Sequence, residues 1–136
     1  MAYEALDFYD IDSLLTDEER MVRDMVRDWV DEKILPNIEK ACHDGVFPDE
    51  WRVDLGEMGI LGAPLEGYGC PGLSYIAYGL ICQELERGDS GVRSFASVQG
   101  SLAMYPIWDF GSEEQKNHYL PKMTTGEWIG CFGLTE

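Results

Sequence analysis

The stretch TDEERMVRDMVRDWVDEKI, residues 16–34, predicts a long amphipathic helix and points to a helical fold. Thr16 and Glu19 have the spacing of a capping box, in which a hydroxyl and a carboxylate satisfy the first free backbone N–H groups of a helix. Apolar residues then recur at helical spacing, at Val22, Met25, Val26, Trp29, Val30 and Ile34. The aspartates between them lie off this stripe, so one face should be buried and the other solvated.

Similar signals predict further helices along the chain. We expect them from Asp49 to Met58, from Ser74 to about Arg87, from Ser90 to about Met104, and from Ser112 to just before Thr124. After residue 126 the pattern changes, and Trp128–Thr135 is typical of a strand. The expected fold class is therefore all-α over residues 1–126, with a first strand of something else in residues 127–136.

Composition excludes two broad classes of partner. The 136 residues include 26 Asp and Glu against 10 Lys and Arg, a formal net charge of −16. Such a chain has too few cations to bind nucleic acid or an anionic membrane surface. The N-terminus is acidic and lacks the apolar core of a secretory or transit signal, and no stretch is long and apolar enough to cross a membrane. We expect no membrane association.

Metal binding is not expected either. The four cysteines form no Cys-x-x-Cys pair and the chain has only two histidines, whereas zinc sites need closely spaced ligands. Free thiols and no metal are the expectation, in a reducing compartment.

The segment GYGCPG, residues 67–72, matches the glycine pattern of dinucleotide-binding loops and precedes a predicted helix. Pro71 removes one N–H from the would-be phosphate cradle, and the segment before it is too rich in glycine and proline for a central strand. No alternation of helices and strands surrounds it. A glycine-rich loop that closely approaches a helix is the favoured interpretation, with nucleotide binding as the alternative.

Arg93 is the single charged side chain between Ser90 and Trp108. Ser97 lies four positions on and shares its helix face, and Glu86 is near enough in sequence to reach the same region. An arginine in an otherwise apolar wall suits a carboxylate or phosphate ligand, which its planar donors can bind bidentately. Two alternatives remain open: a purely structural ion pair with Glu86, or simple surface exposure.

The second half of the chain resembles the N-terminal part of an acyl-CoA dehydrogenase. The matching pieces are GYGCPGLSY at 67–75, ELERGDSG at 84–91, FGSEEQK at 110–116, YLPKM at 119–123 and GEWIGCFGLTE at 126–136. Residues 14–66 fit the first helices of the family. The resemblance implies a helical N-terminal domain over residues 1–126 and the start of a β-rich middle domain at 127–136.

Within that family, VRSFASVQ at 92–99 is most similar to glutaryl-CoA dehydrogenase. The resemblance implies that Arg93 and Ser97 hold the distal carboxylate of glutaryl-CoA, with Glu86 as a nearby polar member of the pocket. It also implies FAD as cofactor, with Phe132, Leu134 and Thr135 at the flavin. The reaction would be α,β-dehydrogenation, with or without decarboxylation to crotonyl-CoA.

The resemblance implies further properties of a whole enzyme. They are a homotetramer, electron-transfer flavoprotein as the acceptor, and residence in the bacterial cytoplasm or, after removal of a transit peptide, in the mitochondrial matrix. The catalytic glutamate of the family belongs to a region after Glu136, so no catalytic residue is expected in this chain, which would be inactive alone. The alternative is a non-catalytic helical interaction module derived from this fold.

Overall fold

The first expected helix is present as α1, Asp17–Trp29, in the computed structural model, which describes residues 6–133. Its capping box forms as expected: the Thr16 hydroxyl accepts a hydrogen bond from the Glu19 N–H at 3.2 Å, and the Glu19 carboxylate accepts from the Thr16 N–H at 2.9 Å. The helix continues as a π-helical turn, η2, Val30–Ile34. Its apolar stripe is buried at its C-terminal end, whereas Met25 stays 40% exposed.

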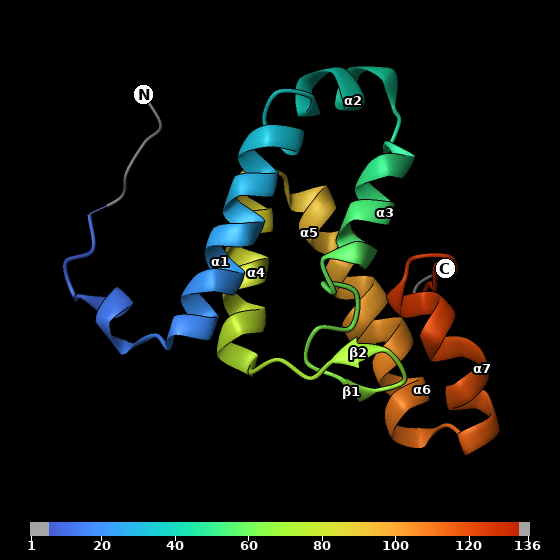
Figure 1. Cartoon of the computed structure of the whole chain (residues 1–136). Helices are drawn as coiled ribbons and strands as arrows, with labels where there is room; N and C mark the ends of the chain where they lie inside the picture. The colour runs from blue at the N-terminus through green and yellow to red at the C-terminus, as the bar shows by residue number, and fades with distance from the viewer. Residues whose placement is uncertain (1–5, 134–136) are drawn as a thin grey trace.

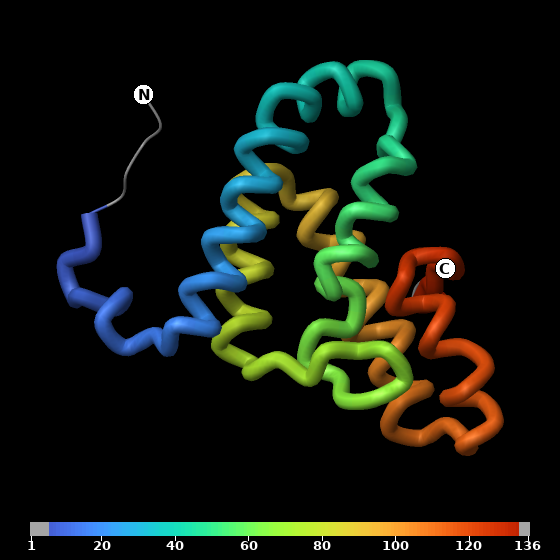
Figure 2. Tube along the Cα trace, in the orientation of Figure 1, coloured from blue at the N-terminus to red at the C-terminus, as the bar shows by residue number. Residues whose placement is uncertain are grey.

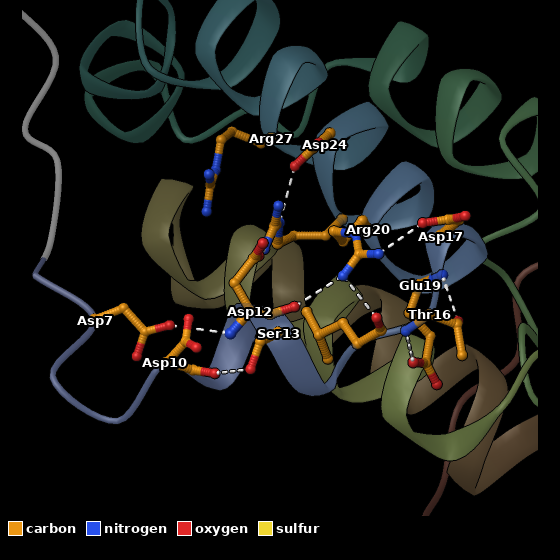
Figure 3. A network of polar contacts seen from close by, with 12 residues as sticks. Asp7, Asp10, Asp12, Ser13, Thr16, Asp17, Glu19, Arg20, Asp24 and Arg27 are labelled. Atoms are coloured by element: carbon orange, nitrogen blue, oxygen red, sulfur yellow. Dashed lines mark hydrogen bonds and ion pairs between the residues drawn. The ribbon is translucent and has the colours of Figure 1, made fainter.

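The start of α1 is joined to the start of α4, Tyr75–Gly88. The second carboxylate oxygen of Glu19 accepts a hydrogen bond from the Ser74 hydroxyl at 2.8 Å, and Ser74 itself caps α4. Figure 3 shows the polar network around this end of α1, where Arg20 donates to the Leu15 carbonyl at 2.6 Å and binds Asp17. These bonds fix the entry of α1, after the short 3₁₀ helix η1, Ile11–Leu14.

The main core lies between α1, α3 (Asp49–Glu57), α4 and α5 (Ser90–Ser97). Figure 1 shows α1 and α4 side by side, with α2, Ile38–Asp44, crossing from α1 to α3. The core residues come from α1, η2, α3, α4, α5 and the loop after α3: Val26, Trp29, Val30, Ile34, Trp51, Leu55, Ile60, Leu61, Ala63, Ile81, Leu85, Val92 and Ala96. Burial of this apolar surface is the main force that holds α4 between α1 and α5.

The helix that begins at Ser90 runs further than expected. After α5 it widens into a π-helical segment, η3, Val98–Met104, and continues as α6, Tyr105–Phe110. Figure 2 shows this path as a continuous trace that leads to α7, Glu113–Thr124. A smaller core of Leu65, Met104, Leu120 and Met123 packs η3 and α7 together.

The GYGCPG segment forms a β-hairpin and not the loop between a parallel strand and a helix that the nucleotide-binding alternative requires. β1, Glu66–Gly67, pairs antiparallel with β2, Cys70–Pro71, and the turn residues Tyr68 and Gly69 both have positive φ. Such a two-residue turn matches the twist of a hairpin. The Gly72 N–H donates to the Leu65 carbonyl at 2.8 Å, so it is not available to a phosphate.

The strand expected at Trp128–Thr135 is not formed within the described residues. Residues 127–133 pair with no other strand there, and Leu134 and Thr135 lie outside the described range. A strand needs a neighbour to accept its backbone hydrogen bonds. The domain boundary at residues 126 and 127 therefore stays a prediction.

No helix in residues 6–133 has both the length and the apolar character that a membrane span requires.

Candidate functional site

Arg93 lies where α4 ends and α5 begins, and it contacts both of the residues expected beside it. Asp89 caps α5 by accepting from the N–H groups of Gly91 and Val92 at 2.8 and 3.0 Å, so the turn between the helices is tight. Arg93 Nε donates to Glu86 Oε2 at 2.7 Å, and Nη1 donates to Ser97 Oγ at 3.3 Å. The three residues thus form one polar cluster, although a binding role for them stays a prediction.

The cluster is accessible to solvent, and the Arg93 guanidinium in it stays protonated. The side chains of Arg93 and Glu86 are 35% and 51% exposed. The hydrogen bond with Glu86 raises the pKa of Arg93 above its ordinary value, so the guanidinium is always charged. Its Nη2 makes no hydrogen bond with the residues that the structure describes. Arg93 therefore has a donor left for an anionic ligand.

Two rows of polar side chains extend this cluster along the α4–α5 interface. Tyr78 and Cys82 precede Glu86 at intervals of four residues on α4, and Ser101 follows Ser97 at the same interval on η3. The Tyr78 hydroxyl and Ser101 Oγ are 3.1 Å apart and share a hydrogen bond. We did not single out these residues from the sequence, but their repeated spacing of four is a signal that could have found them.

Burial shapes the chemistry of this row. It raises the pKa of the Cys82 thiol, against the hydrogen bond with Tyr78 and the charge of Arg93. It also raises the pKa of Tyr78, against the hydrogen bond with Ser101. Both groups are consequently neutral near pH 7, and the row offers hydrogen bonds without a second charge.

Glu84, two residues before Glu86, points the other way. Its side chain is 1% exposed and accepts from Arg27 Nη2 of α1 at 2.6 Å and from Arg87 Nε at 2.8 Å. Arg87 also binds Asp31 at 2.7 Å. This network joins α1 to α4 and leaves no side of the carboxylate open to a ligand.

An apolar groove of about 430 Å³ lies beyond the Arg93 cluster, along the continuous path from α5 through η3 to α6. Its walls come from η3, α6, α7 and the segment 128–132. Phe132, one of the three residues expected at a flavin, lines this groove and is 50% exposed. The other two, Leu134 and Thr135, lie outside the described residues.

Metal chemistry finds no support in the described part of the chain. Within residues 6–133, no three His, Cys, Asp or Glu side chains lie close enough together to hold an ion.

Comparison with known proteins identifies the family. The model of the acyl-CoA dehydrogenase N-terminal domain matches residues 16–127. A probable acyl-CoA dehydrogenase of Bacillus subtilis is 39% identical over 125 residues, which are 90% of this chain and 32% of the relative. The crystal structure of a glutaryl-CoA dehydrogenase from Mycobacterium smegmatis in complex with FADH2 has a TM-score of 0.92 and 50% identity, over 96% of this chain and 34% of that one.

A second solved structure has a different named substrate. Butyryl-CoA dehydrogenase from Megasphaera elsdenii has a TM-score of 0.83 and 34% identity, over 96% of this chain and 34% of that one. The chain spans about a third of the length of these proteins. By the family match and these likenesses, the chain belongs to the acyl-CoA dehydrogenase family and forms its N-terminal domain.

Proposed function

We propose that this domain is part of an FAD-dependent acyl-CoA dehydrogenase that acts on glutaryl-CoA. The observation that carries the proposal is the Arg93 cluster: a permanently charged guanidinium, held by Glu86 and Ser97, with one donor nitrogen left over. The higher identity to a glutaryl-CoA dehydrogenase, 50% against 34% for a butyryl-CoA dehydrogenase, supports the same substrate.

Arg93 would bind the carboxylate at the far end of the acyl chain. A carboxylate accepts well from a guanidinium because both are planar and their hydrogen bonds are charge-assisted. Ser97 and Glu86 would hold the guanidinium in place. The neutral Tyr78–Ser101 pair would line the path of the acyl chain to Arg93 without attracting a second anion. This anchor would fix how far the acyl chain enters, and hence where its reacting carbons lie.

The groove edge has the chemistry that a flavin needs. Phe132 and the apolar groove wall suit the faces of a planar ring. The backbone N–H groups of Cys131 and Phe132 make no hydrogen bond within residues 6–133, so they suit ring oxygens as donors. Phe132, Leu134 and Thr135 would contact the ring, and the bound flavin would accept the hydride. None of the residues assigned to this chain would act as the base that removes the α-proton.

Electron-transfer flavoprotein as acceptor, a homotetrameric assembly and a location in the bacterial cytoplasm or mitochondrial matrix belong to the same proposal. They rest on the resemblance of the motifs. The proposal covers dehydrogenation alone as well as dehydrogenation with decarboxylation to crotonyl-CoA.

Replacing Arg93 with Ala in the whole enzyme tests the assigned substrate. We expect kcat/KM for glutaryl-CoA to fall by about a hundredfold, because a charge-assisted hydrogen-bonding group is lost. Turnover of butyryl-CoA, which has no distal carboxylate, should change little. Steady-state kinetics with both thioesters measure the split. Arg23→Ala, which removes an arginine of α1 that is paired with Asp12 and Asp24, is the matched control.

Equal losses on both thioesters would contradict the role of Arg93. A protein that carries no flavin absorbance and turns over neither thioester would contradict the enzyme itself and favour the helical interaction module.

A further inference from the structure

Gln99 is a buried polar side chain for which neither the fold nor the proposed substrate site accounts. It is 1% exposed, on the π-helical segment η3. Its Nε2 donates to the carbonyls of Met123 and Trp128, both at 2.9 Å, and its Oε1 accepts from the Gly130 N–H at 2.8 Å. A buried amide that makes three such bonds specifies the position of the backbone it binds.

The backbone that Gln99 holds has little other support. Residues 127–133 form no strand pairing within the described residues, and apart from Gln99 the Trp128–Gly130 backbone is held by one bond, from the Trp128 N–H to the Lys122 carbonyl at 3.0 Å. The Trp128 ring rests beneath the Lys122 ammonium, which is 4.1 Å from its centre. Gln99 therefore supplies both described hydrogen bonds between helix η3 and this segment.

The segment also packs closely on η3. A Cβ atom added at Gly130 would lie 2.4 Å from the Ala103 Cβ and 2.9 Å from the Met123 Cε. Contacts that short cannot be accommodated without moving the backbone. The position of residues 128–130 relative to η3 is therefore set tightly, by the hydrogen bonds of Gln99 and by close packing against Ala103, one turn further along η3.

Gln99 and the segment 128–130 that it binds each lie next to one part of the proposed site, the carboxylate anchor and the flavin-facing residues respectively. Ser97 and the Arg93 cluster lie on the turns just before Gln99, and Phe132 follows Gly130 by two residues. We propose that Gln99 is a positioning residue that sets the distance and direction between the acyl-carboxylate anchor and the flavin-facing segment. This inference rests on the proposed function, and it concerns geometry shared by any acyl-CoA substrate.

The test replaces Gln99 with Leu, which keeps the bulk and removes all three hydrogen bonds. Thr124→Val is the matched control, since Thr124 is also buried and its hydroxyl donates to the Leu61 carbonyl at 3.0 Å, away from this segment. In enzyme freed of flavin, Gln99→Leu should speed amide hydrogen exchange at Gly130, whose N–H donates to Gln99, and at the neighbouring Trp128 N–H, and Thr124→Val should not. With flavin restored, kcat should fall about tenfold to a hundredfold for glutaryl-CoA and butyryl-CoA alike, as expected for misplaced reactants.

A second variant guards against a general folding defect. Gly130→Ala displaces the same segment by a clash with Ala103. It should reproduce the loss of kcat, and both variants should shift the flavin absorption spectrum. Unchanged exchange at Trp128 and Gly130, together with kcat values equal to those of Thr124→Val, would overturn the role of Gln99.

The two proposals fail in different ways. A wild-type enzyme that oxidises butyryl-CoA but rejects glutaryl-CoA would refute the assigned substrate, while the effect of Gln99 remains measurable on butyryl-CoA. An enzyme without flavin would refute the proposed function. The exchange experiment would still measure whether Gln99 holds the segment that contains Gly130.

Discussion

Two glutamates on α4 show how similar ion pairs come to have different uses. Glu84 is 1% exposed and is bound by two arginines, Arg27 and Arg87. Glu86 is 51% exposed and is bound by one, Arg93. Successive helical residues are turned by about 100°, so side chains two positions apart face nearly opposite sides. One carboxylate therefore points to α1 and the other to α5.

The difference lies in what each pair leaves unsatisfied. Around Glu84 both carboxylate oxygens have a guanidinium partner, and Arg87 also binds Asp31, so the network is complete within the fold. Around Glu86 the arginine keeps a donor nitrogen on the accessible side. A complete buried network holds helices together, whereas an incomplete, exposed one can take a ligand.

The largest effect should come from Glu84→Ala. It removes a buried carboxylate and both of its ion pairs, so we expect the free energy of unfolding to fall by about 3 kcal/mol. Glu86→Ala, a matched control on the same helix, should leave stability nearly unchanged because its pair is exposed. Urea denaturation of both variants measures the difference. Comparable losses of stability for the two variants would contradict the distinction between a buried, stabilising Glu84 network and an exposed Glu86 pair.

The next largest effect should be a difference between the Glu84 and Glu86 ion pairs in the pH dependence of stability. Burial alone would raise the pKa of Glu84, but hydrogen bonds from Arg27 and Arg87 outweigh it and hold the pKa below the ordinary value of 4.5. A depressed folded-state pKa contributes stability that is fully present above the unfolded-state value and is lost as the pH falls through the folded-state value. We expect the stability gap between wild type and Glu84→Gln to be constant near neutral pH and to shrink below about pH 4.5.

Denaturation midpoints across that range measure the gap, and Glu86→Gln provides the comparison. A gap that stays constant down to the acid unfolding transition would show that Glu84 titrates normally.

Salt should produce the smallest effect. At about 1 M ionic strength the Debye length is about 3 Å, so the half-exposed Arg93 should hold a substrate carboxylate less well, while the buried Glu84 network is screened less. The KM for glutaryl-CoA should rise relative to that for butyryl-CoA, and the ratio corrects for the charges of the CoA moiety itself. A ratio independent of salt would place Arg93 away from the carboxylate.

Local sequence signals predicted the main helices well, because each has an apolar stripe and all but α3 also have a side-chain cap. Thr16, Ser74 and Ser112 each accept a hydrogen bond from the N–H three residues on, as their spacing indicated. Trp51 and Leu55 of α3 are buried as expected.

Elements without those signals were missed or misplaced. The helix α2 has no side-chain cap and no buried residue, so neither signal marks it. The helix expected to end at Met104 continues into α6, whose start accommodates Pro106, since a proline needs no N–H partner in the first turn. The strand expected at Trp128–Thr135 has no described neighbour with which its described residues, 128–133, could pair.

The sequence by itself determined that Arg93 and Ser97 share a face, because helical periodicity is local and needs no knowledge of the rest of the chain. The motifs likewise sufficed to indicate the family. The sequence also indicated Glu86 as a neighbour of Arg93, but only the tertiary structure decided that Glu84 faces α1 instead and that Gln99 holds a segment some thirty residues away. Those partners are set by the packing of α4 between α1 and α5 and of residues 128–130 on η3, and no local spacing encodes such long-range contacts.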